Sequence, residues 1–523
     1  MTETASMEPT PIAGTEDSLK KRYFSKLGAN IIGLVISFLT QAIIPRGLGP
    51  VAYGNFSFLS TFFTQVVDFL DAGTSTAFYS KLSQRPRDHA LLRFYWGFCG
   101  MASILLILLT AAAFGVGLSG WLWPDQSRIY ILMGLIWALF SWYAQIINKV
   151  LDAHGLTVSG EMLRILQKVL GLGLILLMFL SYRFSLTNFF LSQYVILLFL
   201  CCGWWAVIKR NDLALFSRDR LLLAQLRSLS REFYDYSGPL ITAALVGMVG
   251  GLFDRWLLQN FAGSIAQGFY GLSYQIGVLC FLFTSAMTPL FMREMSKAFG
   301  VRDLERMRAM FQRYIPMLFA VAAVLGVFFM VQASRVSLIF GGKSYTQAAV
   351  PIGLMSFYAI HRTYGQLSGS VFLATGQTRL YRNLGVGMIL SGLALSFFML
   401  VPRKFGGLNL GATGLALKMV VAQFVEVNLG LWFNTRFLGL SYWKFLSHQL
   451  FVIGPLAGMS WLASAGVDLL VQNPLIAFLI TGFVYALGCL GLLILFPALF
   501  SVTRPELKNQ LVYLLMRARN QIS

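Results

Sequence analysis

The sequence predicts an all-α integral membrane protein with about 14 transmembrane helices. Of its 523 residues, 57% are hydrophobic and only 12% are charged, whereas a typical soluble domain carries about 25% charged residues. The mean hydropathy is +0.69, and apolar segments recur at the length of about 20 residues that spans a bilayer. Two distant stretches also repeat one another, which predicts two lobes of similar architecture.

Fourteen apolar segments provide the predicted helices. They are residues 27–44, 51–70, 94–117, 129–151, 162–180, 189–208, 240–261, 269–291, 314–331, 348–373, 384–401, 410–433, 450–465 and 475–500. The thirteenth is short and contains Pro455, so it is the least regular member of the series. The polar stretch before the first segment lacks the apolar core of a signal peptide and is expected to be a disordered tail.

Basic residues gather before the first segment, after the last one and in alternate loops between them. The stretch ahead of the first helix carries Lys20, Lys21 and Arg22, and the loop after the second carries Lys81 and Arg85. Cytoplasmic loops of membrane proteins are enriched in Lys and Arg. The pattern predicts a multi-pass protein of the cytoplasmic (inner) membrane with both termini in the cytoplasm and an even number of helices.

Two short motifs recur far apart in the chain. "GPVAYGNF" (49–56) is matched by "GSIAQGFY" (263–270) at a sequence offset of 263 − 49 = 214. "YAQIINKVLDAHG" (143–155) is matched by "YGQLSGSVFLATG" (364–376) at a sequence offset of 364 − 143 = 221. Six predicted helices separate the copies. Because six is even, the two halves have the same orientation across the membrane.

The repeat sets the predicted domain organisation. We expect two parallel six-helix lobes, joined by an amphipathic segment and followed by two further helices. The predicted parts are a disordered cytoplasmic tail (1–19), an N-terminal lobe (20–208), a cytoplasmic linker (209–233), a C-terminal lobe (234–440), two additional transmembrane helices (441–500) and a basic cytoplasmic tail (501–523). Two lobes of this kind are expected to leave a cleft that opens to alternate sides, as in transporters.

Two helix hairpins resemble those of a known family. The first, "RGLGPVAYGNFSFLSTFFTQVVDFLDAG", has Leu48-Gly49-Pro50, an aromatic-Gly pair and then Asp71-Ala72-Gly73. The second contains the pair Asp254-Arg255 and then Gly268-Phe269-Tyr270, with Phe inserted before the Tyr. These features resemble the polysaccharide transporter (Wzx-like) family of the multidrug/oligosaccharidyl-lipid/polysaccharide (MOP) exporter superfamily.

The resemblance implies a MATE-like fold and a flippase. Such a protein moves a lipid-linked (polyprenyl-diphosphate) oligosaccharide across the membrane by alternating access for surface polysaccharide biosynthesis. Its expected partners are that lipid, the surrounding membrane lipids, and a polysaccharide polymerase or glycosyltransferases. No cofactor, metal ion or nucleic acid is expected.

Ionisable and amide side chains inside the predicted helices are the candidate site residues, because such groups are costly in a membrane and usually functional. Arg362 lies well inside the tenth segment, which begins at position 348, and is roughly 21 Å along it. With Lys168 and Arg255 it is expected to bind the diphosphate through charge-assisted hydrogen bonds. The remaining candidates are Asp254, His361, Lys418, Glu426, Arg164, Gln145 and Gln366.

Several of these residues also fit a structural role. Asp254 is equally suited to pairing with a cation on another helix. Arg164 lies close to the cytoplasmic end of its helix, where its side chain can extend to the membrane surface. Gln145 and Gln366, which correspond in the repeat, suit either sugar hydroxyl groups or interhelical packing.

Other functions fit the composition less well. The net charge of 41 − 21 = +20 is accounted for mainly by the loops, and no long soluble stretch is present to bind nucleic acid. A cation-coupled multidrug exporter of the same superfamily has the same predicted fold, but its site should be acidic or aromatic. A membrane enzyme of polysaccharide assembly is expected to have a larger outer loop for its chemistry.

Overall fold

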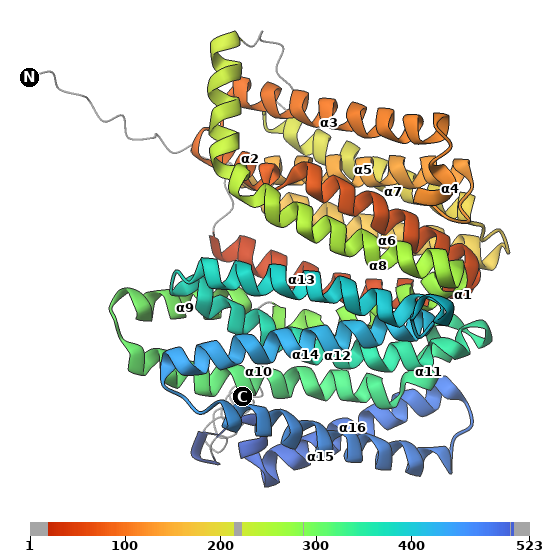
Figure 1. The fold of residues 1–523 in the computed structure, drawn as a ribbon, viewed down its shortest axis with the longest axis vertical. Helices are drawn as coiled ribbons and strands as arrows, with labels where there is room; N and C mark the ends of the chain where they lie inside the picture. The colour runs from red at the N-terminus through yellow and green to blue at the C-terminus, as the bar shows by residue number, and fades with distance from the viewer. Residues whose placement is uncertain (1–18, 214–221, 286, 503, 507–523) are drawn as a thin grey trace, which may run out of the picture. The chain divides into compact units, whose positions relative to one another are not determined.

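The structure is a computed structural model that describes residues 19–213, 222–285, 287–502 and 504–506. These residues form sixteen α-helices and three short 3-10 helices, and no β-strand occurs among them (Figure 1). The chain is therefore all-α, as predicted from its composition. It divides into two compact units, which are described separately below.

Each repeat begins with a long helix that is broken at a glycine. α1 (Leu19–Asp71) is interrupted at Gly49, where φ is 72° and ψ is 169°. α8 (Leu223–Ser285) is interrupted at Gly263, where φ is 72° and ψ is −174°. Positive φ favours glycine because it has no Cβ. The two matched "G-x-(V/I)-A" motifs thus form the same turn twice.

Unit 1 holds residues 59–248 and the start of α1 up to Thr40. Besides parts of α1 and α8, it contains α2 (Thr74–Gln84), α3 (His89–Gly115), α4 (Ser119–Leu122), α5 (Arg128–Ala153), α6 (Thr157–Leu180) and α7 (Leu186–Arg210). Polar side chains cap the starts of three of these helices. Asp88 accepts from the Leu91 amide in α3, and Ser127 and Ser185 do the same for α5 and α7. Such caps satisfy amides that lack a helical partner.

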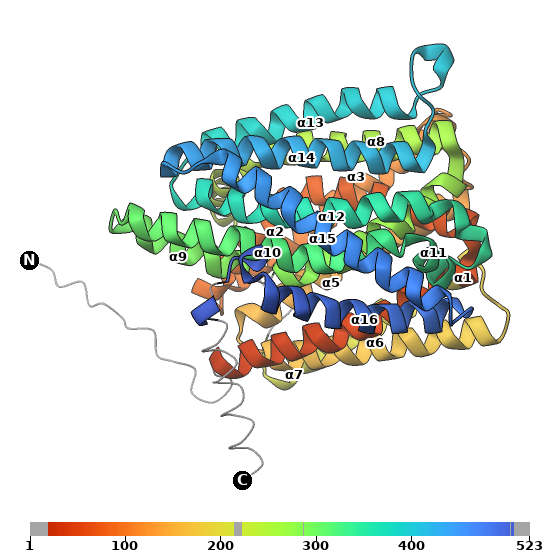
Figure 2. The same cartoon turned by 90° about the horizontal axis from the view of Figure 1, so that it is seen from below.

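Unit 2 holds residues 41–58 together with the chain from Val249 onward. Its remaining elements are α9 (Thr288–Gly300), α10 (Leu304–Val331), α11 (Ala333–Gly341), η1 (Lys343–Ala348), α12 (Ala349–Ala374), α13 (Thr378–Leu400), η2 (Arg403–Phe405), α14 (Gly411–Leu438), α15 (Tyr442–Asp468), α16 (Pro474–Leu495) and η3 (Pro497–Phe500). α12 packs against α10 and α14, and α15 packs against α10 and α16 (Figure 2).

The repeat found in the sequence is also present in the structure. α2 and α9 start at Thr74 and Thr288, and 288 − 74 equals the first motif offset of 214. α6 and α13 start at Thr157 and Thr378, and 378 − 157 equals the second motif offset of 221. α15 and α16 follow the second copy. The architecture of two similar halves plus two additional helices is therefore confirmed.

Within unit 2, the segments that follow the two glycine turns cross at very short range. A Cβ atom on Gly54 would overlap the carbonyl oxygen of Ser264 and lie 2.8 Å from the Gly268 amide nitrogen. A Cβ atom on Gly268 would overlap the carbonyl oxygen of Pro50. The contacts are reciprocal, because 264 − 50 and 268 − 54 both equal 214. The two copies of the motif therefore pack against each other with local two-fold symmetry.

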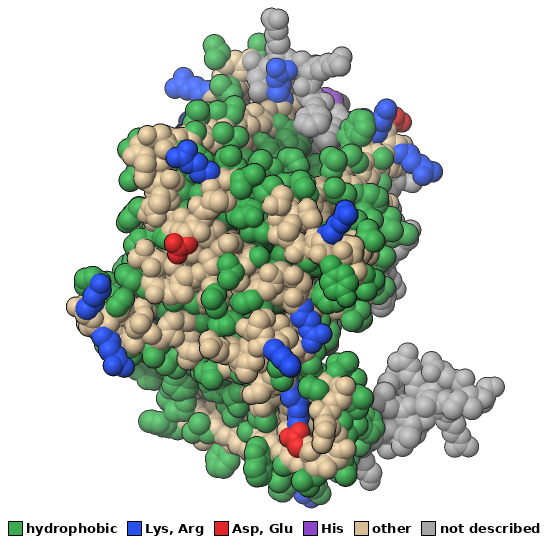
Figure 3. Space-filling view, turned by 90° about the vertical axis from the view of Figure 1, so that its right-hand side faces the viewer, with side chains coloured by type: hydrophobic (Ala, Val, Ile, Leu, Met, Phe, Trp, Pro, Cys, Tyr) green, Lys and Arg blue, Asp and Glu red, His purple; other side chains and the backbone are tan. Residues whose placement is uncertain are grey.

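The chain is a multi-pass membrane protein. Within the described residues, eleven helices are long and apolar enough to cross a bilayer. Two of these, within α1 and α8, contain the glycine breaks, and α12 is not among the eleven. The exact count of fourteen stays a prediction. Figure 3 shows a face on which many hydrophobic side chains lie at the surface and Lys and Arg are scattered among them.

Two predicted segments differ in length from the helices observed. The thirteenth, expected to be short, is the 27-residue α15, which accommodates Pro455 inside a continuous helix. The eighth, predicted to span residues 269–291, is not one helix, because Met287 lies in a turn just before α9 begins at Thr288. Residues 1–18, 214–221 and 507–523, which include most of the predicted tails and part of the linker, lie outside the described residues. The predicted domain boundaries stay predictions.

Candidate functional site

A polar pocket of about 260 Å³ lies in unit 2 between α12, α13 and α14. Six of its lining residues supply polar side chains: Arg362, Gln366, Ser368, Tyr381, Gln423 and Glu426. Arg362 and Gln366 lie one turn apart on α12, so they share a face. The pocket brings together three of the predicted site residues, namely Arg362, Gln366 and Glu426.

Glycines on α12 make room for this pocket. A Cβ atom on Gly365 would lie 2.9 Å from Cγ2 of Val427. A Cβ atom on Gly369 would lie 3.2 Å from the ring of Tyr381. Both residues line the pocket, and their spacing of four places them on one face of the helix. A larger residue at either position would fill space that is now accessible.

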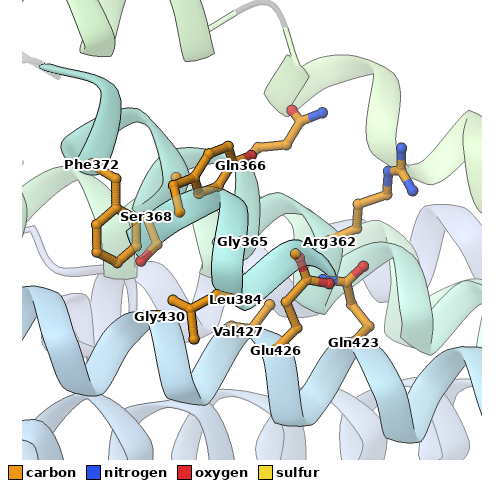
Figure 4. A pocket seen from close by; sticks show the side chains of 13 residues that line it. Arg362, Gly365, Gln366, Ser368, Phe372, Leu384, Gln423, Glu426, Val427 and Gly430 are labelled. Atoms are coloured by element: carbon orange, nitrogen blue, oxygen red, sulfur yellow. The ribbon is translucent and has the colours of Figure 1, made fainter. Parts of the chain in front are cut away.

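The polar groups of the pocket come from facing helices. Figure 4 shows Arg362 and Gln366 on one helix and Gln423 and Glu426 on another. Arg362 Nη1 donates to the Tyr358 hydroxyl at 2.5 Å, and Gln423 Nε2 lies 3.5 Å from Glu426 Oε2. The site thus combines one cation, one anion and several hydrogen-bonding groups. It is polar and mixed in charge rather than purely basic.

Asp254 and Lys418 form an ion pair elsewhere in unit 2. Lys418 Nζ on α14 lies 2.6 Å from Asp254 Oδ2 on α8. The hydroxyl of Ser396 on α13 donates to Asp254 Oδ1 at 2.5 Å. The pair therefore joins three helices. This arrangement matches the structural alternative considered for Asp254, and a binding role for either residue stays a prediction.

Arg255 is held inside the crossing of the two glycine-turn segments. Its side chain is 8% exposed. Its Nη1 donates to Gln267 Oε1 at 3.0 Å, and the guanidinium lies 4.6 Å from the centre of the Tyr270 ring. Gln267 in turn donates to the Arg255 carbonyl oxygen at 2.5 Å. These contacts fix the local packing of α8.

His361 points away from the pocket although it neighbours Arg362 in the sequence. It is 2% exposed and lies among the rings of Phe319, Phe357 and Phe424. Adjacent residues of a helix point about 100° apart. This separation explains how Arg362 lines the pocket while His361 packs in the interior.

The remaining predicted residues lie in unit 1. Arg164 on α6 pairs with Glu161 at 3.1 Å, and Gln145 on α5 is exposed. Lys168, also on α6, is half-buried. Its side chain packs against Gly33 of α1, because a Cβ atom on Gly33 would lie 3.3 Å from Lys168 Cε. Pocket residues Arg362, Gln366 and Glu426 belong to unit 2. The candidates Arg164, Gln145 and Lys168 therefore belong to a different unit from the pocket residues.

Several residues around the pocket, and one in unit 1, were not predicted from the sequence. Tyr381 and Gln423 line the pocket, and Gly365 and Gly369 give it space. The Gly-x-x-x-Gly spacing was a usable signal, because small residues at this interval mark close helix packing. In unit 1, Lys149 lies inside α5 and within the fourth predicted span. A lysine in an apolar segment was also a signal for a site.

Comparison with known proteins places the chain in a family. A model of the family described as "Polysaccharide biosynthesis protein" matches residues 19–295, which is more than half of the 523 residues. The chain belongs to this family. It is also 26% identical over 351 residues to the teichuronic acid biosynthesis protein TuaB of Bacillus subtilis (strain 168). That match covers 64% of this chain and spans 66% of the length of TuaB.

Solved structures show the fold of this family member. The lipid II flippase MurJ, in an inward closed conformation, superposes with a TM-score of 0.62 at 14% identity, covering 90% of this chain and 98% of MurJ. An inward-facing multidrug resistance MATE transporter of the MOP superfamily gives a TM-score of 0.58 at 17% identity, covering 79% and 97%. The chain has the MOP-superfamily fold, as its repeat and hairpin motifs predicted.

Proposed function

We propose that this protein is a flippase that moves a polyprenyl-diphosphate-linked oligosaccharide across the cytoplasmic membrane for surface polysaccharide biosynthesis. The family match and the likeness to TuaB support a role in polysaccharide assembly. The MOP-superfamily fold supports transport by alternating access. The lipid carrier, the orientation with cytoplasmic termini and the partnership with a polymerase or glycosyltransferases are parts of this proposal.

The observation that carries the proposal is Arg362 in a polar pocket that α12 forms with α13 and α14, two helices long and apolar enough to cross a bilayer. Arg362 lies halfway along α12, which runs from Ala349 to Ala374. A guanidinium at this depth is costly unless it meets an anion or a polar cavity. Its planar fork matches phosphate oxygens, and the amides of Gln366 and Gln423 offer donors and acceptors for sugar hydroxyls.

One feature of the pocket favours a second candidate function. Glu426, together with the rings of Phe372 and Tyr381, would suit an organic cation. That combination is expected in a cation-coupled drug exporter. The two functions make opposite demands on the pocket, because an anionic cargo needs Arg362 whereas a cationic one needs Glu426.

Complementation of a strain that lacks the gene separates these functions. We expect Arg362→Ala to abolish surface polysaccharide, because the cargo loses its phosphate donor. Arg362→Lys should retain part of the activity, since it keeps the charge and loses the fork. The matched control is Arg379→Ala, which removes an exposed arginine near the start of α13.

All variants are compared at equal membrane abundance, measured by immunoblotting. Full activity of Arg362→Ala would contradict the proposal. A variant set in which Glu426→Gln abolishes export of cationic drugs while Arg362→Ala leaves surface polysaccharide intact would support the drug exporter instead.

A further inference from the structure

Four polar side chains share one face of α5 in unit 1. Gln145, Asn148, Lys149 and Asp152 follow the spacing i, i+3, i+4, i+7, so they lie on one side of the helix. α5 is one of the helices long and apolar enough to cross the membrane. A face of this composition is unfavourable against lipid. It is therefore expected to meet water, protein or a polar ligand.

The internal repeat relates this face of α5 to the pocket of unit 2. The sequence offset of 221 maps Gln145 onto Gln366 and Asn148 onto Gly369. Gln366 and Gly369, the two corresponding residues on α12, both line the pocket. The same offset maps Ser141 onto Arg362. The face of α12 that forms the pocket thus has its counterpart in the polar face of α5, but the cation is at a different position.

Lys149 is the cation on the α5 face. It is half-buried, and its ammonium group donates to the hydroxyl of Ser75 in the first turn of α2. Among the residues that the structure describes, no carboxylate lies within 4.0 Å of this ammonium group. A hydrogen-bonded link to an acid runs through Ser75, whose hydroxyl donates to Asp71 Oδ2 at 2.7 Å.

The Asp71 carboxylate is already surrounded by donors. Its Oδ1 accepts from Thr74, from the Tyr95 hydroxyl at 3.2 Å and from Trp142 Nε1 at 3.3 Å. Lys149 therefore contacts a neutral hydroxyl instead of pairing with this acid. An ammonium group has three N–H donors, so an incoming anion would find donors available on a positively charged group.

We propose that the polar face of α5 is a second cargo-binding surface, on which Lys149 receives a phosphate group and Gln145 and Asn148 contact sugar hydroxyls. This inference rests on the proposed flippase function. Lys149 lies about one helical turn before Ala153, the last residue of α5, which is roughly 6 Å along the helix axis. In the proposed orientation this end is cytoplasmic, at the depth of lipid phosphates, whereas Arg362 lies at mid-helix. Lys149 would meet the cargo first.

Binding of short isoprenoid lipids to the purified full-length protein tests this inference. The probes are farnesyl diphosphate and its uncharged analogue farnesol. We expect Lys149→Gln to weaken binding of farnesyl diphosphate about tenfold, which corresponds to about 1.4 kcal/mol of binding free energy. Binding of farnesol should not change. Lys149→Arg should restore most of the affinity. The matched control, Lys209→Gln, removes an exposed lysine at the end of α7 and should have no effect.

The outcomes separate this inference from the proposed function. If Arg362→Ala weakens diphosphate binding and Lys149→Gln does not, the inference about Lys149 is overturned but the proposed function is not. Unchanged binding in both variants would overturn the anionic cargo as well. Thermal unfolding identifies a Lys149→Gln protein that is merely destabilised. In that case Gln145→Leu, which alters an exposed residue of the same face, must lower affinity for a glycosylated lipid diphosphate, and an unchanged affinity would overturn the inference.

Discussion

The glycine turns and the polar helix faces are both repeated in this chain, yet they differ in how closely the two copies agree. The turns at Gly49 and Gly263 have the same φ of 72° and bring Gly54 and Gly268 into reciprocal contact. The faces of α5 and α12 share a glutamine but place their cations at positions that do not correspond, Lys149 and Arg362.

The difference follows from the physical demands on each region. Backbones that touch tolerate no side chain between them, so both copies of the crossing need glycine. A binding face needs only that its polar groups suit a ligand, and a large asymmetric cargo does not require the same group from each half. The repeat therefore preserves the packing of the fold while the candidate binding residues diverge.

Gly54→Leu is expected to have the largest effect on folding, because it places a side chain where the two glycine-turn segments touch. Its Cβ would overlap a main-chain oxygen, which cannot move aside as a flexible side chain can. We expect loss of folded protein from the membrane, measured by fluorescence-detected size-exclusion chromatography. Gly100→Leu is the matched control, since nothing lies within 4 Å of a Cβ at Gly100 in α3. Normal folding of Gly54→Leu would show that the crossing is not essential.

Loss of the Asp254–Lys418 ion pair is expected to have a smaller effect on stability. This pair tests a position at which the two halves of the repeat differ. Asp254 corresponds to Thr40 at the offset of 214, and Thr40 satisfies its hydroxyl within its own helix at 2.7 Å. Asp254→Ala leaves Lys418 without its partner and should destabilise the protein by about 3 kcal/mol. The double variant Asp254→Asn with Lys418→Met should recover most of that stability, because neither charge remains.

Thermal unfolding of the detergent-solubilised protein measures these differences. Glu294→Ala is the control, because it breaks only exposed pairs with Lys297 and Arg306 and should change stability by less than about 1 kcal/mol. If the double variant is stable but no longer supports surface polysaccharide, the pair has a role in transport beyond packing. If Asp254→Ala is as stable as the unaltered protein, the pair does not join the helices.

The fold was largely predictable from the sequence. Apolar length and the matched motifs indicated an all-helical protein of two similar halves, because each of these signals is local. Details that depend on backbone geometry were less accessible. The turn at Met287 lies inside a predicted span, since an apolar run does not reveal where a helix ends. Pro455 lies within a continuous helix because membrane helices tolerate proline.

The candidate site was only partly predictable. Arg362, Gln366 and Glu426 were all candidates from the sequence, and the structure places the three of them around one pocket. The sequence could not show which helices form that pocket, so Tyr381 and Gln423 were missed. The same limit applies to Arg255, whose contacts with Gln267 and Tyr270 depend on the turn of α8 at Gly263. Lys149 was overlooked although its position in an apolar run was visible.

The most direct test of the proposed function is analysis of lipid-linked saccharides in a strain that lacks the gene. The flippase account predicts that a polyprenyl-diphosphate-linked oligosaccharide accumulates on the cytoplasmic side, inaccessible to probes added outside intact spheroplasts. Expression of the unaltered protein should return it to the outer leaflet, and Arg362→Ala should not. Normal levels of the intermediate in the deletion strain, with normal access from outside, would contradict the account.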